Sequence, residues 1–492
     1  MPSINKQVTD QGGKITTEFK LIKGFTYVHS TETPSAFPED KAHTLSSNDH
    51  INVENDDATR RLSTTPTLRL PNNGLKTQKV TDGEVARLAG RPLHPLTLAD
   101  LAKFGRPPLT ANQLLDSANF TLSILPSRLA HRIQSLRNLP FIVVSNPNVS
   151  KIHNNYVHSL STLLPYASRE IKTLEDEIQF TSVMADLVQT HSNTISILAR
   201  GFLEARKYIS PNEVTKFLDE HLRARIGTRL IAEQHIALHF SSKPHLELSE
   251  QKTHIDSSYI GVIDTKLRPV DIIRHCEGLV GDICEYKYGV RPSVVIRGEP
   301  ETTLAHIPMH LEYIITELLK NAFRATIEKE NERHPIEVTI APAPEEIKGR
   351  PNGITNYDQG SVDAASGAQR PANAASANIR PLEKSTPGVT IRIRDRGGGI
   401  PPAAYAKLWE FGFTTFNEQE IVDITSGGTN DGDGLNALSN AGGNENSLAG
   451  LGYGLKLGRA YAEYFGGGIR VQSLLGWGTD VYLSLRGVGN ID

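Results

Sequence analysis

The sequence predicts an α+β protein in which a helical bundle precedes a second domain of mixed strands and helices. Apolar residues recur at three- and four-residue spacing between residues 67 and 239, which indicates amphipathic helices. After residue 257, short β-branched segments alternate with helical ones. A chain of 492 residues is long enough for about two to four domains.

Four segments carry the helical pattern of the first half, and their short links favour a bundle. They are residues 110–124, 150–164, 170–206 and 211–239. The strands expected in the second half are residues 259–262, 293–296, 336–341, 389–394, 469–473 and 480–486. The predicted organisation is a disordered segment at 1–64, a helical-bundle domain at 65–256 and an α/β domain at 257–488.

Composition excludes several classes of protein. The formal net charge is only −3, so nothing favours nucleic acid or a membrane surface as a partner. The apolar runs are too short to span a membrane, which predicts a soluble protein. The two cysteines, Cys276 and Cys284, lie in one helical pattern without metal-ligand spacing, so we expect buried free thiols.

Three segments lack the periodicity of packed structure. Residues 1–59 contain no arginine but several acidic residues, so they do not resemble a mitochondrial presequence; a disordered tail and a misplaced start codon both remain open. Residues 343–387, rich in Pro, Ala, Gly and Ser, are expected to form a disordered insertion. Residues 417–449 precede a glycine motif, which favours a mobile lid over an inert linker.

The first chemical motif is a helix at residues 310–326. On this helix Glu317, Asn321 and Arg324 fall within one arc, and the apolar residues Ile315, Leu318, Leu319 and Ala322 fall within another. An asparagine oxygen can bind Mg²⁺, and a carboxylate one turn earlier can take a proton from an attacking hydroxyl. Taken alone, the pattern also fits an ordinary solvated face.

The second motif, residues 388–400, is an alternating strand that ends at Asp395. Gly397, Gly398 and Gly399 follow, so a flat ring can approach the backbone while the aspartate accepts a hydrogen bond from an adenine amino group. A plain Asp-Gly turn is the alternative.

The third motif, residues 450–467, places Gly450, Gly452 and Gly454 before a helix, and Thr479 later opens a final strand. Backbone N–H groups at a helix N-terminus favour phosphate. The motif is not followed by the GKS or GKT of a P-loop, and it lacks the context of a dinucleotide-binding fold.

The order of these motifs resembles the ATP-binding fold shared by gyrase, heat-shock chaperones, MutL and histidine kinases. It comprises an ExxxN helix, a strand ending in DxGxG, a Gly-rich lid, GxGxGL before a helix and a closing GT strand. The implied fold is a helical bundle followed by an α/β-sandwich ATPase domain of the histidine-kinase type. In this superfamily Glu317 is typical of transfer to water or a hydroxyl, because a histidine acceptor needs no base.

Several segments also resemble the mitochondrial 2-oxoacid dehydrogenase kinases. They are ILPSRLAHRIQSLRNLPFIVVSNP, HSNTISILARGF, RIGTRLIAEQHIALH, CEYKYG, TELLKNAFRAT, DRGGGI and RAYAEYFGG. The resemblance covers roughly residues 65–488. It implies a protein serine kinase of the mitochondrial matrix, a homodimer whose bundle recognises the lipoyl domain of the acyltransferase core. Using Mg-ATP, it would phosphorylate and inactivate the decarboxylase subunit of the complex.

Matching positions imply the roles of the site residues. Glu317 would be the general base and a nucleotide contact, Asn321 would bind Mg²⁺ and nucleotide, and Asp395 would hold adenine. The other nucleotide-binding residues implied by the resemblance are Lys320, Arg324, Gly397, Gly399, Thr414, Thr415, Gly450, Leu451, Gly452, Tyr453, Gly454, Leu455 and Thr479.

The substrate complex stays open at the level of sequence. Tyr313, where pyruvate dehydrogenase kinases typically have His, and FTT at 413–415 resemble the branched-chain type. The insertion at 343–387 departs from both. A histidine kinase and a non-catalytic ATP-binding scaffold are the alternative functions. His191 is expected to be structural or regulatory, because HSNTISILA lacks the proline of phospho-accepting signatures. Arg225, Arg229 and His235 are candidate contacts for a small carboxylate.

Overall fold

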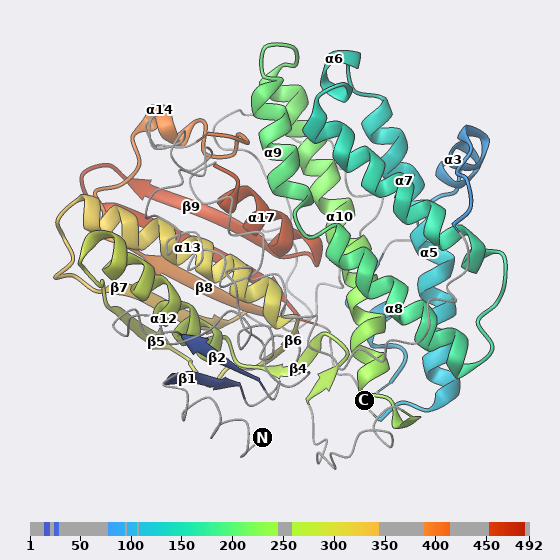
Figure 1. The fold of residues 1–492 in the computed structure, drawn as a ribbon. Helices are drawn as coiled ribbons and strands as arrows, with labels where there is room; N and C mark the ends of the chain where they lie inside the picture. Colours follow the sequence, from blue (N-terminus) through green and yellow to red (C-terminus); the bar gives the residue numbers. More distant parts are fainter. Residues whose placement is uncertain are drawn as a thin grey trace, which may run out of the picture.

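The structure, a computed structural model, describes residues 14–19, 24–28, 77–93, 96–105, 108–244, 258–343, 388–413 and 452–487. Helices form the first half of this region and a mixed sheet with its helices forms the second, side by side (Figure 1). The predicted α+β fold is confirmed. Most of the predicted insertion at 343–387 and the whole predicted lid at 417–449 lie outside the described residues.

Long helices of the first half pack on one another. They are α5 (Ala111–Arg137), α7 (Pro147–Ala167), α8 (Leu174–Thr190), α9 (Thr194–Glu204) and α10 (Pro211–Phe240), with the short helices α3 (Asp82–Ala89), α4 (Leu98–Ala102) and α6 (Phe141–Val144) beside them. Four of the long helices, α5, α7, α8 and α10, begin at a residue whose side chain caps the helix. Thr110 and Ser210 form capping boxes that open α5 and α10.

The predicted helix at residues 170–206 is wrong in one respect, because the structure breaks it in two. Thr173 caps α8 by accepting a hydrogen bond from Asp176 N, and α8 ends at Thr190, with His191 as its C-cap residue. α9 begins at Thr194, whose hydroxyl donates to the His191 carbonyl. Apolar spacing continues across the break, so the pattern alone did not show it.

The second half contains a five-stranded sheet in the order β5-β7-β8-β10-β9. Its strands are β5 (Val294–Gly298), β7 (Ile336–Pro342), β8 (Gly388–Arg394), β9 (Gly468–Leu474) and β10 (Gly478–Arg486). β5 and β7 are parallel and the other pairs antiparallel. Arg394 and Asp480 face each other across β8 and β10 with two 2.6 Å hydrogen bonds, which stabilises this register.

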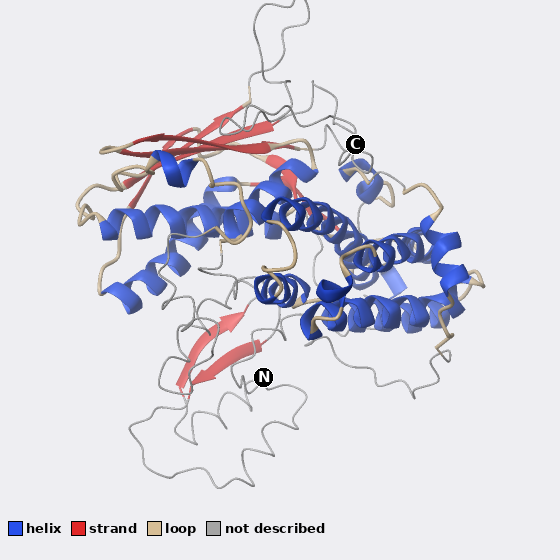
Figure 2. Ribbon diagram, turned by 90° about the horizontal axis from the view of Figure 1, so that it is seen from above, coloured by secondary structure: helices blue, strands red, loops and turns tan. Residues whose placement is uncertain are grey.

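Helices α12 (Pro269–Tyr288), α13 (Pro308–Glu328) and α17 (Gly454–Tyr464) form a layer against one face of this sheet (Figure 2). α14 (Pro402–Tyr405) is attached at the sheet edge, where the Tyr405 hydroxyl donates to Val471 O at 2.8 Å. A smaller sheet of β3 (Tyr259–Ile260), β4 (Ile263–Leu267) and β6 (Leu304–His306) lies beside α13. The predicted strand at 259–262 is wrong in its bounds, because the chain turns after Ile260 and β4 begins at Ile263. The residue pattern predicted neither β4 nor the three-residue β6.

An antiparallel hairpin of β1 (Lys14–Phe19) and β2 (Gly24–Val28) lies within the segment for which the sequence predicts disorder. The rest of residues 1–64 is outside the described part of the chain.

One cluster of buried apolar side chains extends from Val85 in α3 to Leu485 in β10. It includes Ile315, Leu318, Leu319 and Ala322, so the apolar arc predicted for α13 is confirmed. Cys276 and Cys284 are buried free thiols, and burial raises their pKa, for Cys276 to about 12 and for Cys284 to about 11. The described helices lack the combination of length and apolarity that a membrane span requires.

Candidate active site

Glu317 lies in the middle of α13 and is almost completely buried. Lys320, one turn later, donates from Nζ to Glu317 Oε1 at 2.8 Å. The first residue of α17, Gly454, is pressed against the same carboxylate: a Cβ added at Gly454 would collide with Glu317 Oε2. Two helices far apart in sequence therefore fix the position of one carboxylate.

Asn321 follows Glu317 by one helical turn, and its side chain is exposed. It can therefore reach a ligand that lies outside α13. Arg324, predicted to join it, forms an ion pair with Glu328 on its own helix. The predicted arc is thus uneven, with a buried acid at one end and accessible polar groups at the other.

Asp395 directly follows β8 and is buried. Its Oδ1 accepts hydrogen bonds from the backbone N–H of Gly397 at 2.8 Å and of Thr479 at 3.2 Å. Burial raises the pKa of this carboxyl, and the two backbone donors oppose that shift. The side chain is thus held in one orientation at the end of the sheet.

Two glycines of the turn after Asp395 have no room for a side chain. A Cβ at Gly397 would collide with Ala325 of α13, and its distance from the Ala325 carbonyl carbon would be 2.7 Å. Gly399 has φ +75° and lies against the Leu474 carbonyl. The turn therefore fits closely between α13 and the β9–β10 hairpin.

The glycine motif before α17 closes the site from the other side. Gly452 has φ +74° and lies against the Phe413 carbonyl, so residues on both sides of the predicted lid meet here. Tyr453 is buried, with its ring centroid 5.3 Å from that of Phe411, and Leu455 is half-buried. Thr414, Thr415, Gly450 and Leu451 lie outside the described residues.

Thr479 belongs to a short polar chain that the sequence analysis missed. Its hydroxyl is 3.1 Å from the Ser473 hydroxyl, which accepts a hydrogen bond from Ile400 N at 2.7 Å. Ser473 and Thr479 are register partners in the β9–β10 hairpin. Only this register could have predicted that Ser473 lies beside Thr479, and the alternating pattern of a strand does not specify its register with a neighbour.

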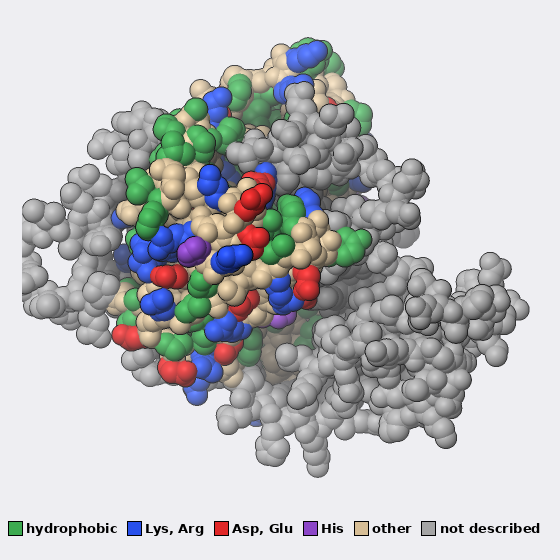
Figure 3. Space-filling view, turned by 90° about the vertical axis from the view of Figure 1, so that its left-hand side faces the viewer, with side chains coloured by type: hydrophobic (Ala, Val, Ile, Leu, Met, Phe, Trp, Pro, Cys, Tyr) green, Lys and Arg blue, Asp and Glu red, His purple; other side chains and the backbone are tan. Residues whose placement is uncertain are grey.

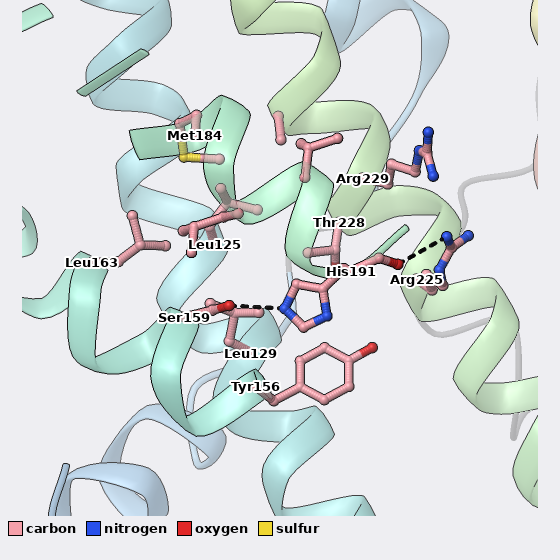
Figure 4. A pocket seen from close by; sticks show the side chains of 13 residues that line it. Leu125, Leu129, Tyr156, Ser159, Leu163, Met184, His191, Arg225, Thr228 and Arg229 are labelled. Carbon is pink, nitrogen blue, oxygen red and sulfur yellow. Dashed lines mark hydrogen bonds between the residues drawn. The ribbon is translucent and has the colours of Figure 1, made fainter. Parts of the chain in front are cut away.

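A second polar region lies in the bundle, around a cavity of about 50 Å³ (Figure 4). His191 points into it, with Nε2 2.8 Å from the Ser159 hydroxyl and its ring 4.5 Å from that of Tyr156. Arg225 donates to the carbonyls of His191 and Ser192 at 3.2 and 3.3 Å. Burial, reinforced by Arg225 and His158, lowers the pKa of His191 to about 4, so the ring is neutral at pH 7.

Of the three candidate carboxylate contacts, Arg225 and Arg229 line this cavity, whereas the prediction for His235 is wrong. The His235 ring is fully buried between the hydroxyls of Ser117 and Thr181, at 3.1 and 3.0 Å. His235 lies on a part of α10 that faces the bundle interior, and its place on the same helix as Arg225 and Arg229 did not reveal this.

Two family models match successive parts of the chain. One, described as mitochondrial branched-chain alpha-ketoacid dehydrogenase kinase, matches residues 95–264. The other, described as the histidine kinase-, DNA gyrase B- and HSP90-like ATPase, matches residues 306–488.

Curated relatives match over most of their length. Pyruvate dehydrogenase (acetyl-transferring) kinase 1, mitochondrial, of Saccharomyces cerevisiae is 28% identical over 405 residues, 81% of this chain and 85% of the relative. The mitochondrial pyruvate dehydrogenase (acetyl-transferring) kinase of Arabidopsis thaliana is 28% identical, covering 80% and 91%. Pyruvate dehydrogenase (acetyl-transferring) kinase isozyme 4, mitochondrial, of Mus musculus is 25% identical over 85% of this chain and 90% of the relative.

The chain belongs to the mitochondrial 2-oxoacid dehydrogenase kinase family. Membership in this kinase family agrees with the helical half followed by the sheet half, and it identifies the sheet half as an ATPase of the histidine-kinase type. The ATP-binding family model spans the α13 motif, the Asp395 turn and the glycine motif. ATP use therefore follows from the family, and the space bounded by these three segments is the candidate nucleotide site.

The structure brings Glu317, Asp395, Gly397, Gly454 and Thr479 into one connected region by the contacts described above. Lys320 joins it through Glu317. Among the described residues, no three His, Cys, Asp or Glu side chains cluster as a metal site would require.

Proposed function

We propose that the protein is a Mg-ATP-dependent protein serine/threonine kinase that phosphorylates the decarboxylase subunit of a mitochondrial 2-oxoacid dehydrogenase complex and inactivates it. The observation that carries this proposal is the contact between Glu317 and Gly454. It joins a candidate base to the turn that opens α17, next to the segment at Phe413. Family membership and the names of the relatives support the same activity.

Glu317 is the proposed general base. Its carboxylate takes the proton of the substrate serine hydroxyl while the hydroxyl oxygen bonds to the γ-phosphorus and the bond to the ADP oxygen breaks. Lys320, 2.8 Å from Oε1, orients the carboxylate, and Gly454 limits its movement on the opposite side. Burial keeps water away from the reacting proton.

The remaining site residues bind nucleotide in this proposal. Asp395 accepts the adenine amino hydrogen bond, and Asn321 holds Mg²⁺, which neutralises charge on the phosphates when bound. The backbone N–H groups that open α17 face the phosphates. The further proposed nucleotide contacts are Lys320, Arg324, Gly397, Gly399, Thr414, Thr415, Gly450, Leu451, Gly452, Tyr453, Gly454, Leu455 and Thr479.

The two halves have separate proposed tasks. Residues 65–256 recognise the lipoyl domain of the acyltransferase core, and residues 257–488 carry out phosphoryl transfer. We further propose a homodimer that acts in the mitochondrial matrix. The relatives are named mitochondrial, and this supports the location.

Glu317→Gln tests the base assignment. Radiolabel transfer from ATP to purified decarboxylase subunits of the pyruvate and branched-chain complexes, offered side by side, is the measurement. We expect turnover to fall by at least about 100-fold because the amide cannot accept the proton, while nucleotide affinity stays within about twofold. The matched control is Glu312→Gln, which changes a carboxylate on the same helix that lies 3.6 Å from His275 Nε2.

The outcomes separate the candidate functions. Acid-stable phosphate on one decarboxylase subunit supports the proposal and identifies the complex. Acid-labile phosphate on the enzyme itself would indicate a histidine kinase, although the half-buried His191 is poorly accessible to ATP, because its Nε2 lies 2.8 Å from the Ser159 hydroxyl. Nucleotide binding without transfer to either subunit would indicate a scaffold. Full turnover in the Glu317→Gln variant would exclude this residue as the base.

A further inference from the structure

The aromatic rings of Trp409 and Phe411 each lie against a cationic side chain of α17. Lys456 Nζ lies 4.9 Å from the ring centroid of Phe411, and Arg459 Cζ lies 4.3 Å from that of Trp409. Positions 456 and 459 are three apart and share one face of the helix. A cation above the face of an aromatic ring is attracted to that ring, so this face of α17 holds the segment of residues 409–413 in place.

The next turn of α17 connects this contact to the bundle. Arg459 Nε donates to Glu463 Oε1 at 2.6 Å, and Arg223 of α10 donates to Glu463 Oε2. Arg223 Nε also donates to Asp219 Oδ2 at 3.2 Å. These four charged side chains and Trp409 form a continuous row, which we call the seam network. It runs from a bundle helix to the edge of the proposed nucleotide site.

The seam network is well shielded from water. The side chains of Arg223 and Glu463 are 12% and 17% exposed, so their attraction is screened less than that of a surface pair. Burial would raise the pKa of Glu463, but Arg223 and Arg459 hold it below its usual value. Glu463 is therefore a carboxylate at neutral pH, and it fixes the plane of the Arg459 guanidinium over the indole.

The held segment touches the glycine turn directly. The Phe413 carbonyl lies against Gly452, and the Phe411 ring is 5.3 Å from that of Tyr453. Gly454, the next glycine, lies against Glu317. A shift of residues 409–413 would therefore displace the part of the turn at Gly452 and Tyr453 that faces the phosphates.

We propose that Arg459 and Glu463 are positioning residues for the nucleotide site, and that Arg223 makes the geometry of that site depend on the bundle. The inference rests on the proposed function, because it assumes that nucleotide binds between Glu317 and the glycine turn. It assigns a role in nucleotide affinity to Arg223, a residue of α10, outside the three motifs that surround the nucleotide.

Arg223→Gln in the full-length chain tests this proposal. The chain has two tryptophans, so a Trp477→Phe background leaves Trp409 as the sole indole emitter. We expect the substitution in α10 to shift the emission maximum of Trp409, because Arg459 loses its orientation when Glu463 is released. Calorimetric titration with Mg-ATP should show a five- to tenfold weaker Kd. KM for ATP should rise by the same factor, and kcat should change less than twofold.

Arg223→Lys and Asp282→Asn are the controls. Arg223→Lys keeps a cation near Glu463, so this variant should recover at least half of the lost affinity. Asp282→Asn removes an exposed ion pair with Arg291 and should leave both readouts unchanged. Both measurements are made at least 15 °C below the melting temperature of each variant, so partial unfolding does not enter the result.

If the ion pair of Arg223 with Glu463 is purely structural, Arg223→Gln will lower the melting temperature, but the Trp409 emission maximum and the Kd for Mg-ATP will equal those of the background protein. This result would overturn the proposal. If Arg223→Gln does not fold, the same two measurements are made on Arg459→Lys, which keeps the charge but loses the planar stacking on Trp409. A shifted emission maximum with a weaker Kd supports the positioning role, and no change in either contradicts it. Absence of Mg-ATP binding by the parent chain would instead refute the proposed function.

Discussion

Gly454 and Gly458 lie four residues apart on α17, yet the structure leaves room for a side chain only at the second. A Cβ at Gly454 would overlap Glu317 Oε2, whereas the nearest atom to a Cβ at Gly458 is Ile469 Cδ1 at 3.7 Å. The obstacle at Gly454 is the end of a flexible side chain, which can move aside. The fold can therefore accommodate an alanine at Gly454 by displacing the proposed base.

We expect Gly454→Ala to reduce kcat by about 100-fold with little change in melting temperature, since a misplacement of about 1 Å at a reacting group has this effect. Gly458→Ala is the matched control: it should keep full activity and stabilise the helix by about 0.5–1 kcal/mol. Steady-state kinetics and thermal unfolding measure both effects. Normal turnover in Gly454→Ala would show that Glu317 does not need its present position.

The secondary structure around the candidate site residues was predictable from the sequence, but their tertiary contacts were not. Motif spacing predicted Glu317 on a helix and Asp395 at the end of a strand, and the structure has them within α13 and directly after β8. Local spacing gave no signal that Gly454 confines Glu317 or that Ser473 supports Thr479, because these contacts join distant segments. The same limitation explains the error at His235, where two other helices determine which face of α10 is buried.

At the scale of elements, strand and helix periodicity predicted the long members and missed the short or interrupted ones. The strand predicted at 389–394 became β8 (Gly388–Arg394) almost unchanged. β6 was not predicted, because a strand of three residues is too short to show an alternating pattern. The break between α8 and α9 depends on the hydrogen bonds at His191, which apolar spacing does not report.

The close approach of α10 and α17 is a second feature that requires glycine. A Cβ at Gly227 would collide with the Tyr464 hydroxyl and come within 2.9 Å of an Arg128 nitrogen. We expect Gly227→Ala to destabilise the protein by about 1–3 kcal/mol, because overpacking a buried contact forces the helices apart. Denaturant unfolding measures this loss.

A Tyr464→Phe background should reduce the cost of Gly227→Ala, since it removes the atom that a Cβ would meet first. Gly278→Ala, on an open face of α12 with no neighbour within 4 Å, is the control and should be neutral or mildly stabilising. An equal cost of Gly227→Ala in both backgrounds would show that the tyrosine hydroxyl does not set the helix separation.

At the scale of the molecule, the helical half and the sheet half share one apolar core rather than two. The seam network adds charges to this shared interface, with Arg223 on one side and Glu463 on the other. Basic and acidic side chains are also mixed over the described surface seen in Figure 3, as the near-neutral composition leads one to expect. Neither the shared core nor the pairing of residues 223 and 463 follows from sequence, because both depend on how the halves pack.

Glu463 gives this interface a defined dependence on pH. Its folded-state pKa is lowered, since Arg223 and Arg459 outweigh the opposing effect of burial. A carboxyl group with a depressed folded pKa stabilises the protein fully above its unfolded pKa of about 4.5, and this contribution is lost as pH falls through the folded value. The ion pairs at the interface are therefore intact at neutral pH and weaken only in acid.

We expect Glu463→Gln to lower the free energy of unfolding by roughly 3 kcal/mol at pH 7, because two partly buried guanidinium groups lose their shared partner. The difference between parent and variant should stay constant from pH 7 to about pH 5 and shrink below about pH 4.5, as the parent carboxylate is protonated. Denaturant unfolding across this range measures both curves, with Asp282→Asn, an exposed pair, expected to cost less than about 1 kcal/mol at pH 7. A difference that grows as the pH falls would have the opposite sign to a depressed pKa, and it would show that Arg223 and Arg459 do not stabilise the charged form of Glu463.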